Sequence, residues 1–480
     1  MSFINKVRSI FSPRDMCIGP PWKRIAEFAF PMLIGNFAQQ LYNTVDAVVV
    51  GRSKWGYTAL AAVGNAGPVM FLLLSLFVGI ATGAGVLVSQ YFGARKKEEL
   101  GMTIGNCITI TGLASVFIMI VGPIITGPLL RAVDTLPEVF DQSRSYLNIF
   151  FLGIAGTLFY NIFAGILRGL GDSFSALVIL FICSGLNVVG DILLVDSMGV
   201  AGVAIATVVS QIISAMLCLM QLLRLKHLFV LTKETLKPKK MFVKDLVRLG
   251  LPSGLTQAIF SFAMLAVQAL INSFEDAMFV ACNVMVMRVD GYAMLPNFSF
   301  GQAMSTYAGQ NVGARKLDRL YQGAKQGTLM AFLTAVILTP LVLIGGPSLM
   351  GLFTPGNVQL INMSMTMMYI ISPGYVAMSI TQSLSGVMRG AGDTVTPMWI
   401  SLATSILIRV PLAYILVAIA RNAGAPVLTQ QKMVFVSLLS AWTLGMIINV
   451  IAYKAGRWKK RQVNRIEAEL AQENAALATE

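Results

Sequence analysis

The sequence predicts an all-α membrane protein of about twelve transmembrane helices, arranged as two parallel six-helix repeats (N- and C-lobes) around a central cavity. Three observations lead to this prediction. The 480 residues are 56% hydrophobic and only 12% charged, whereas soluble domains carry about 25% charged residues. About twelve apolar segments are long enough to cross a bilayer. The two halves of the chain also share motifs in a common register.

The predicted spans follow one another closely along the chain. They are 25–50, 58–90, 101–128, 145–168, 174–195 and 199–224 in the first half, and 245–272, 280–311, 326–350, 362–388, 396–420 and 431–455 in the second. No cleavable signal peptide is predicted, because Met1–Lys23 is basic and polar, without an apolar core.

The charges between the spans predict the topology. Lys and Arg gather on alternate connections, and an excess of these residues marks the cytoplasmic side. We therefore expect a multi-pass protein of the plasma membrane with both termini in the cytoplasm. The formal charge of +14 is explained by these clusters and not by nucleic-acid binding. The predicted divisions are an N-terminal segment 1–24, an N-lobe 25–225, a cytoplasmic linker 226–244, a C-lobe 245–456 and a cytoplasmic tail 457–480.

Three features of the first half recur in the second. Gln90–Lys96 recurs as Gln310–Lys316, Gly165–Ser173 as Gly386–Thr394, and Pro31 corresponds to Pro252. The offset is roughly 220 residues in each case, which is the register that a duplication predicts. Each repeat holds an even number of spans, so both begin on the same side of the membrane. The repeats must therefore be parallel.

Asp46 lies inside the first predicted span. A carboxylate at such a position costs roughly 2.5–3.5 kcal/mol on insertion scales, so it needs a wet cavity, a polar partner or a proton. Pro31 lies upstream in the same span, where it removes a backbone hydrogen bond and allows a bend. A helix with both features could couple the binding of a proton or cation to movement.

A second carboxylate, Asp191, follows Asn187 by four residues in the fifth span. The two side chains share a helix face, and Thr207 in the sixth span could add a hydroxyl. Oxygen ligands suit hard cations. Hydrogen bonding between helices is the alternative role of such polar groups. Two intramembrane carboxylates favour a functional site, because their cost is high for packing alone.

The second half offers two further candidates for the substrate cavity, Asp290 and Met287. Asp290 either forms an internal salt bridge with the nearby Arg288 or lines the cavity, and the sequence favours neither. Met287 belongs to a segment rich in Met and Phe. Flexible methionine surfaces suit promiscuous binding, although packing or lipid contact is the ordinary role of most such residues.

Enzymatic chemistry has no support in the sequence. The glycine-rich loops lack the Lys-Ser/Thr of a phosphate-binding loop, and Asp172 and Asp393 are expected to cap the helices that follow them. No HExxH, GxSxG or paired Cys/His motif is present. The five cysteines are scattered, which predicts free thiols. The only histidine, His227, lies in the linker and receives no role. We expect no enzyme, no cofactor and no bound metal beyond a coupling ion.

Taken together, these motifs resemble those of the multidrug and toxic compound extrusion (MATE) family. The resemblance runs from Pro31 to the twelfth span. It rests on Asn43-Thr-Val-Asp46, the paired Gln-x-x-Gly-Ala-Arg loops, the two Leu/Met-Arg-Gly-x-Gly-Asp-Ser/Thr loops, and Asn187-x-x-x-Asp191 followed by Gly199–Thr207.

The resemblance implies an antiporter that exports amphipathic organic cations in exchange for H⁺ or Na⁺ by alternating access. Carried over residue by residue, the coupling-ion site would comprise Asp46, Asn187, Asp191 and Thr207, while Gln39, Tyr42 and Asn161 would line the cavity and Pro31 would act as a hinge. Further acidic residues that some members carry in the seventh and tenth spans have no counterpart here. The protein is expected to be a monomer in the lipid bilayer, without a nucleic-acid partner. Proton and sodium coupling remain equally open.

Two other functions and one other architecture fit the sequence less well. A flippase for lipids or polysaccharide precursors on a related fold should line its cavity with Arg and Lys, whereas the predicted interior carries carboxylates. An ion channel or receptor-like module fits poorly with the duplication and the paired acids. The major facilitator superfamily shares the twelve-span plan, but the paired glycine-rich loops fit the extrusion family better.

Overall fold

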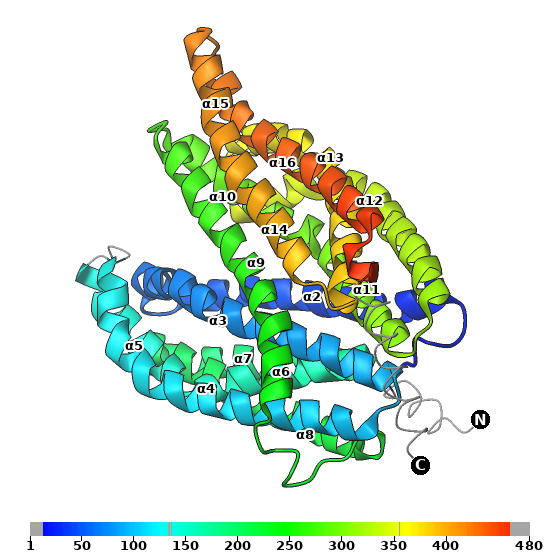
Figure 1. The fold of residues 1–480 in the computed structure, drawn as a ribbon. Helices are drawn as coiled ribbons and strands as arrows, with labels where there is room; N and C mark the ends of the chain where they lie inside the picture. The colour runs from blue at the N-terminus through cyan, green and yellow to red at the C-terminus, as the bar shows by residue number, and fades with distance from the viewer. Residues whose placement is uncertain (1–12, 133–134, 136, 355, 461–480) are drawn as a thin grey trace, which may run out of the picture. The chain divides into compact units, whose positions relative to one another are not determined.

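The structure is a computed structural model that describes residues 13–132, 135, 137–354 and 356–460 (Figure 1). The described chain is helical and contains no strand in these ranges. Its helices are α2 (Pro21–Arg52), α3 (Gly56–Gly93), α4 (Lys97–Ala132), α5 (Pro137–Leu152), α6 (Ile154–Gly169), α7 (Ser173–Met198), α8 (Val200–Arg224), the short η1 (Lys226–Leu228), α9 (Lys240–Asn272), α10 (Ala277–Ala293), α11 (Leu295–Gly313), α12 (Leu317–Phe353), α13 (Val358–Gly390), α14 (Val395–Leu402), the π-helix η2 (Ala403–Ile408), α15 (Arg409–Asn422) and α16 (Val427–Ala455).

Each of the twelve predicted spans corresponds to one helix or to one interrupted helix. Among the described residues, eight helices are long and apolar enough to cross a membrane, and two bent helix pairs bring this number to ten. The remaining two are α2 and α13, which are as long as their neighbours but carry more polar residues, Asp46 included. The predicted fold class is therefore confirmed. Most of the predicted tail and the first twelve residues lie outside the described ranges.

Two predicted spans are interrupted. The span predicted at 145–168 is formed by α5 and α6, which meet at Gly153 with a bend of 54°. A Cβ at Gly153 would lie 2.2 Å from the Val208 side chain, so the break lets α8 approach closely. The span predicted at 280–311 is formed by α10 and α11, bent by 41° next to Pro296. Proline is favoured at the first turn of a helix, where its missing N–H is tolerated.

Contacts divide the chain into two compact units. Unit 1 comprises Met1–Asp15 and Phe30–Gly254, and unit 2 comprises Met16–Ala29 and Leu255–Glu480. The lobe boundary expected from the sequence, at the linker 226–244, stays a prediction. The helices α2 and α9 each begin in one unit and end in the other. Pro31 and Pro252 lie within two residues of these crossing points, inside otherwise continuous helices.

In unit 1, glycine pairs hold the first part of α9 against α3. A Cβ added at Gly79 would come within 2.2 Å of the Gly254 backbone nitrogen, and one at Gly83 within 2.6 Å of the Gly250 nitrogen. Each helix thus presents a Gly-x-x-x-Gly pattern to the other, which is the small-residue packing typical of membrane helices. This crossing explains why Lys240–Gly254 belongs to unit 1.

The linker 226–244 is hydrogen-bonded to the first part of α4. The Val230 N–H donates to the Lys97 carbonyl at 3.3 Å, and the Thr109 hydroxyl donates to the Leu236 carbonyl at 2.6 Å. The Asn106 side chain accepts from the Lys239 N–H at 2.8 Å. The linker therefore has a defined path up to the first residue of α9.

In unit 2, the segment before α2 docks on the loop that repeats the Gln-x-x-Gly-Ala-Arg motif. The Gln310 side chain accepts from the Met16 N–H at 2.8 Å, and the Arg319 guanidinium donates to the Met16 carbonyl at 3.0 Å. The core of this unit is built where α13 packs against α11, α12 and α16. Buried Met367, Met368 and Tyr375 lie in that core.

The paired glycine-rich loops cap helices as predicted. Asp172 accepts from the Ser175 N–H at 3.0 Å and begins α7. Asp393 accepts from the Thr396 N–H at 3.1 Å at the start of α14. Each aspartate satisfies a backbone donor that the first turn leaves unpaired. These two aspartates, which recur in both repeats, thus serve as helix caps.

Candidate functional site

Five of the predicted residues come together inside unit 1, four of them on α2 and α7 and the fifth, Thr207, on α8. Tyr42 and Asp46 lie four residues apart on α2, and Asn187 and Asp191 lie four residues apart on α7. Residues with this spacing share a helix face. The two faces meet each other, so a hydroxyl, an amide and two carboxylates converge at one place.

The centre of the site is a pair of carboxylates. The side chains of Asp46 and Asp191 lie in hydrogen-bond contact with each other. Asp191 is 0% exposed and Asp46 is only partly buried. The Oδ1 atom of each is buried and has no hydrogen-bond partner within the described residues. Two adjacent carboxylates cannot both remain charged and unpaired, so the pair requires a shared proton or a cation.

Asn187 connects the pair to α8. The oxygen and nitrogen of an amide are told apart by their hydrogen-bond partners. With the nitrogen turned toward the carboxylate, Asn187 donates to Asp191 Oδ2 at 3.2 Å and accepts from the Thr207 N–H at 3.1 Å. The same amide contacts the Tyr42 hydroxyl. Asn187 is 2% exposed, so these bonds fix its orientation.

Tyr146 on α5 is a member of the site that the sequence did not reveal. Its hydroxyl hydrogen-bonds to the Thr207 side chain, and it lies close to both carboxylates. It is 6% exposed. Tyr146 stands at the start of a predicted span, and no motif surrounds it in the sequence. Its place in the site became apparent only from the packing of α5, the first part of the bent α5–α6 pair.

A close helix contact brings α7 and α8 into position. A Cβ at Gly190, beside Asp191, would lie 2.8 Å from the Cβ of Ala206, the neighbour of Thr207. Only a residue without a side chain permits this approach. Gly190 and Ala206 therefore set the distance between the Asn187–Asp191 face and Thr207.

The weaker cavity candidates of unit 1 lie outside this hydrogen-bonded group. Gln39 is exposed on α2. Asn161 donates its amide to the Thr157 carbonyl of its own helix at 2.8 Å. Within the described contacts neither reaches the carboxylate pair. Their role as cavity lining remains a prediction.

In unit 2, Asp290 has other neighbours than Arg288. It lies on α10 within hydrogen-bond reach of the Tyr375 hydroxyl and is attracted by Arg409, the first residue after the π-helix. Arg288 is exposed, and no ion pair joins it to Asp290 among the described residues. Met287 is 42% exposed, and its sulfur accepts from the Asn283 amide at 3.6 Å.

The unit 1 site offers oxygen atoms of several kinds and no nitrogen ligand of the imidazole type. The described residues contain no cluster of three or more His, Cys, Asp or Glu side chains that could hold a metal. Carboxylate, amide and hydroxyl oxygens suit a proton or a weakly held hard cation. The arrangement can therefore bind and release one positive charge inside the membrane.

Comparison with known proteins gives a family match over both repeats. The family model MatE matches residues 31–193 and 252–415. Each match begins at one of the paired prolines, Pro31 and Pro252, as the internal duplication predicts. YoeA of Bacillus subtilis, named a probable multidrug resistance protein, is 28% identical over 455 residues, which cover 93% of this chain and 96% of that protein. NorM of Thermotoga maritima, with the same description, is 24% identical over 92% of this chain and 94% of its own.

Solved structures share the fold. One, described as the outward-facing conformation of a multidrug resistance MATE family transporter of the MOP superfamily, has a TM-score of 0.85 at 23% identity and covers 92% of this chain and 97% of its own. Another, described as MATE in the bent conformation, has a TM-score of 0.81 at 24% identity and covers 93% and 98%. At these identities the likeness confirms the two-lobe helical architecture.

Proposed function

The chain belongs to the MatE family, and we propose that it is a secondary active efflux antiporter for amphipathic organic cations, driven by H⁺ or Na⁺. The observation that carries the proposal is the contact between Asp46 and Asp191 in the interior of unit 1. The names of the curated relatives support multidrug efflux. We further propose a plasma-membrane location with cytoplasmic termini, in accordance with the charges between the spans.

The carboxylate pair would act as a reversible charge. Without a coupling ion, the pair is negative and attracts a cationic compound. Binding of H⁺ or Na⁺ neutralises it, which weakens the hold on the compound. A ligand shifts a conformational equilibrium only through different affinities for the two states. Transport therefore requires that the pair binds the ion more tightly in one facing state than in the other.

The surrounding residues would tune this exchange. Asn187 donates to Asp191, and the Thr207 side chain hydrogen-bonds to the Tyr146 hydroxyl, so the polar shell of the pair is fixed by three helices besides α2. Asp46 is the partly accessible member and would meet the ion first. Pro31, in the same helix as Asp46, offers a bending point between this site and the start of α2.

The test is dye efflux by the reconstituted protein, with the proton and sodium gradients collapsed separately. Wild-type protein should lose efflux when one of the two gradients is removed, which also identifies the ion. Asp46→Asn and Asp191→Asn should each lose efflux with either gradient present. Asp141→Asn is the matched control, because Asp141 is exposed on α5. Normal uphill transport by Asp46→Asn would refute the coupling assignment.

The flippase alternative predicts cationic side chains around the site. The described partners of the pair are Tyr42, Tyr146, Asn187 and Thr207, none of them basic. Transport of a lipid-linked anion by the reconstituted protein, in the absence of cation transport, would favour that alternative.

A further inference from the structure

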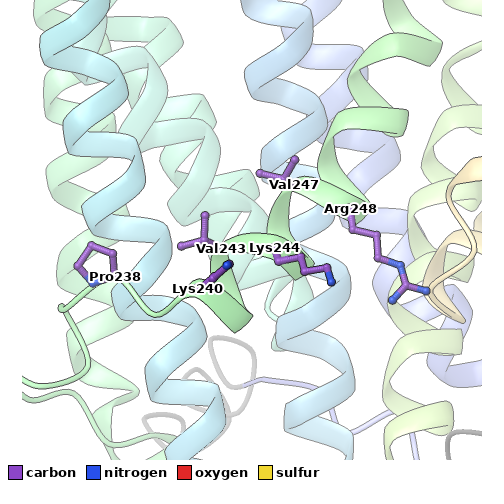
Figure 2. A pocket seen from close by; sticks show the side chains of 6 residues that line it. All are labelled: Pro238, Lys240, Val243, Lys244, Val247 and Arg248. Carbon is purple, nitrogen blue, oxygen red and sulfur yellow. The ribbon is translucent and has the colours of Figure 1, made fainter.

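A second feature of unit 1 lies away from the carboxylate pair, where the linker enters α9. A pocket of about 610 Å³ is lined there by Pro238, Lys240, Val243, Lys244, Val247 and Arg248 (Figure 2). Three of these six side chains are cationic and three are apolar. A ligand that fills the pocket must therefore match both kinds of surface.

The sequence spacing orders these side chains on α9. Lys240, Lys244 and Arg248 follow one another at four-residue intervals, so they form a row on one helix face. Val243 and Val247 precede two of the cations by one residue and form an apolar strip beside the row. Lys240, Lys244 and Arg248 are all exposed.

The position of the row along α9 places it at the membrane surface. Arg248 is the last charged residue of the helix, and the 24 residues Leu249–Asn272 carry none. At 1.5 Å per residue they extend about 36 Å, enough to cross a hydrocarbon core of about 30 Å. Arg248 thus lies at the edge of the core, and Lys244 and Lys240 lie at steps of about 6 Å further out, at headgroup depth.

Few acidic residues lie near this row in the sequence. Asp245 is the only acidic residue between Lys237 and Glu275 in the sequence, and it is not part of the pocket lining. Glu234 is paired with Lys237 at 2.8 Å. The lining itself therefore presents three positive charges and no negative one.

The backbone on either side of the pocket is held in place by hydrogen bonds and helix packing. The first wall of the pocket, Pro238, is held by hydrogen bonds between α4 and Lys239, the next residue, and between α4 and Leu236, two residues earlier. Its other wall is fixed where Gly250 and Gly254 of α9 pack on Gly83 and Gly79. A preorganised site loses little conformational entropy when it binds a ligand.

We propose that this pocket binds an anionic phospholipid, with the headgroup phosphate on the row Lys240–Lys244–Arg248 and an acyl chain along Val243 and Val247. Charge complementarity selects a phosphate group. The apolar strip and the depth of the row favour a lipid over free phosphate. The inference depends on α9 spanning a membrane and not on the proposed transport.

The test is lipid binding by the purified full chain in nanodiscs and by native mass spectrometry. Phosphatidylglycerol should raise the unfolding midpoint relative to phosphatidylcholine and should remain bound to the wild-type protein. Lys244→Gln should weaken this binding roughly fivefold, and K240Q/K244Q/R248Q roughly 100-fold, because basic residues at a membrane surface contribute about equally. Raised salt should weaken it as well.

Two matched variants make the result decisive. K226Q/K233Q/K239Q removes the same charge from exposed linker positions outside the lining, and it should bind phosphatidylglycerol as the wild type does. K240R/K244R/R248K keeps the charge and should also bind. Equal losses in both glutamine triples, or unchanged binding by K240Q/K244Q/R248Q, would overturn the proposal. So would competition by inorganic phosphate or a soluble acidic peptide at the concentration of the lipid.

Discussion

Asp46 and Asp191 differ in their access to solvent, although they touch each other. Asp191 is fully buried and receives a hydrogen bond from Asn187, whereas Asp46 is partly buried on a helix that also carries Pro31. We therefore propose that an ion entering the pair would meet Asp46 before Asp191. Under this proposal, Asp46 would serve entry of the ion and Asp191 its retention.

Asp290 and Arg409 form the second group of charges inside the helices. Asp290 Oδ1 and Arg409 Nε are both buried without a hydrogen-bond partner in the described part of the chain, yet the two groups attract each other. Removing one member of a buried charge pair leaves the other uncompensated. We predict that Asp290→Asn or Arg409→Gln destabilises the protein by roughly 3 kcal/mol, and that the double variant loses less than the sum.

The measurement is unfolding of the purified variants, analysed as a double-mutant cycle. The control cycle pairs Asp290→Asn with Arg288→Gln, because Arg288 is exposed and does not contact Asp290 in the described ion pairs. Additive losses in the Asp290–Arg409 cycle, or coupling in the control cycle, would show that this assignment of partners is wrong.

The contact between α7 and α8 depends on one residue of each helix. Gly190→Ala would place a Cβ 2.8 Å from the Ala206 Cβ and force the helices apart. We predict a loss of about 1–3 kcal/mol, typical of overpacking, together with impaired efflux, because Asn187 would separate from Thr207. Gly185→Ala on the same helix meets nothing within 4 Å and should leave both properties unchanged. Equal behaviour of the two variants would contradict this view of the contact.

Pro31 stands where α2 passes from unit 2 into unit 1, two residues after the crossing point. Restoring the missing backbone hydrogen bond should make the helix harder to bend. Pro31→Ala is therefore predicted to bind substrate with little change but to transport it several times more slowly. Pro123→Ala in α4 is the control, since this proline lies within unit 1. Unchanged turnover by Pro31→Ala would exclude a hinge at this residue.

The helices were predictable from the sequence because long apolar segments have few alternatives in a membrane. The breaks at Gly153 and Met294 were not, since each depends on a neighbour or a proline within a continuous apolar run. The π-helix Ala403–Ile408 left no sequence signal either. Asp46 and Asp191 were predictable because a carboxylate inside a membrane span is energetically costly. Asn187 was predictable because it precedes Asp191 by four residues and so shares its helix face. Tyr146 and the true partners of Asp290 came from helix packing, which a single sequence does not encode in any short pattern.

The two repeats of the molecule share loops but not sites. Gln-x-x-Gly-Ala-Arg and the capping aspartates recur in both, and the family model matches each half separately. Among the described residues, the carboxylate pair lies in unit 1, whereas unit 2 places one carboxylate near an arginine and a tyrosine. The two repeats therefore share features of the scaffold but differ in the polar groups of their interiors.

The parallel plan predicts which connections share a side of the membrane. Lys233 in the linker should lie on the side of both termini, and Glu275 between α9 and α10 on the opposite side. A membrane-impermeant thiol reagent should thus label Lys233→Cys from the cytoplasm and Glu275→Cys from outside. The wild type is the control, because all five native cysteines are buried. Labelling of both positions from one side would contradict the topology.

The most direct test of the central claim is to count ions released when a cationic substrate binds to the purified protein. A pH indicator in weak buffer reports protons, and displacement of radioactive sodium reports Na⁺. We predict that substrate displaces one of these ions from the wild type and none from the Asp46→Asn variant. Equal release from both proteins, or none from the wild type despite substrate binding, would contradict the role of the carboxylate pair.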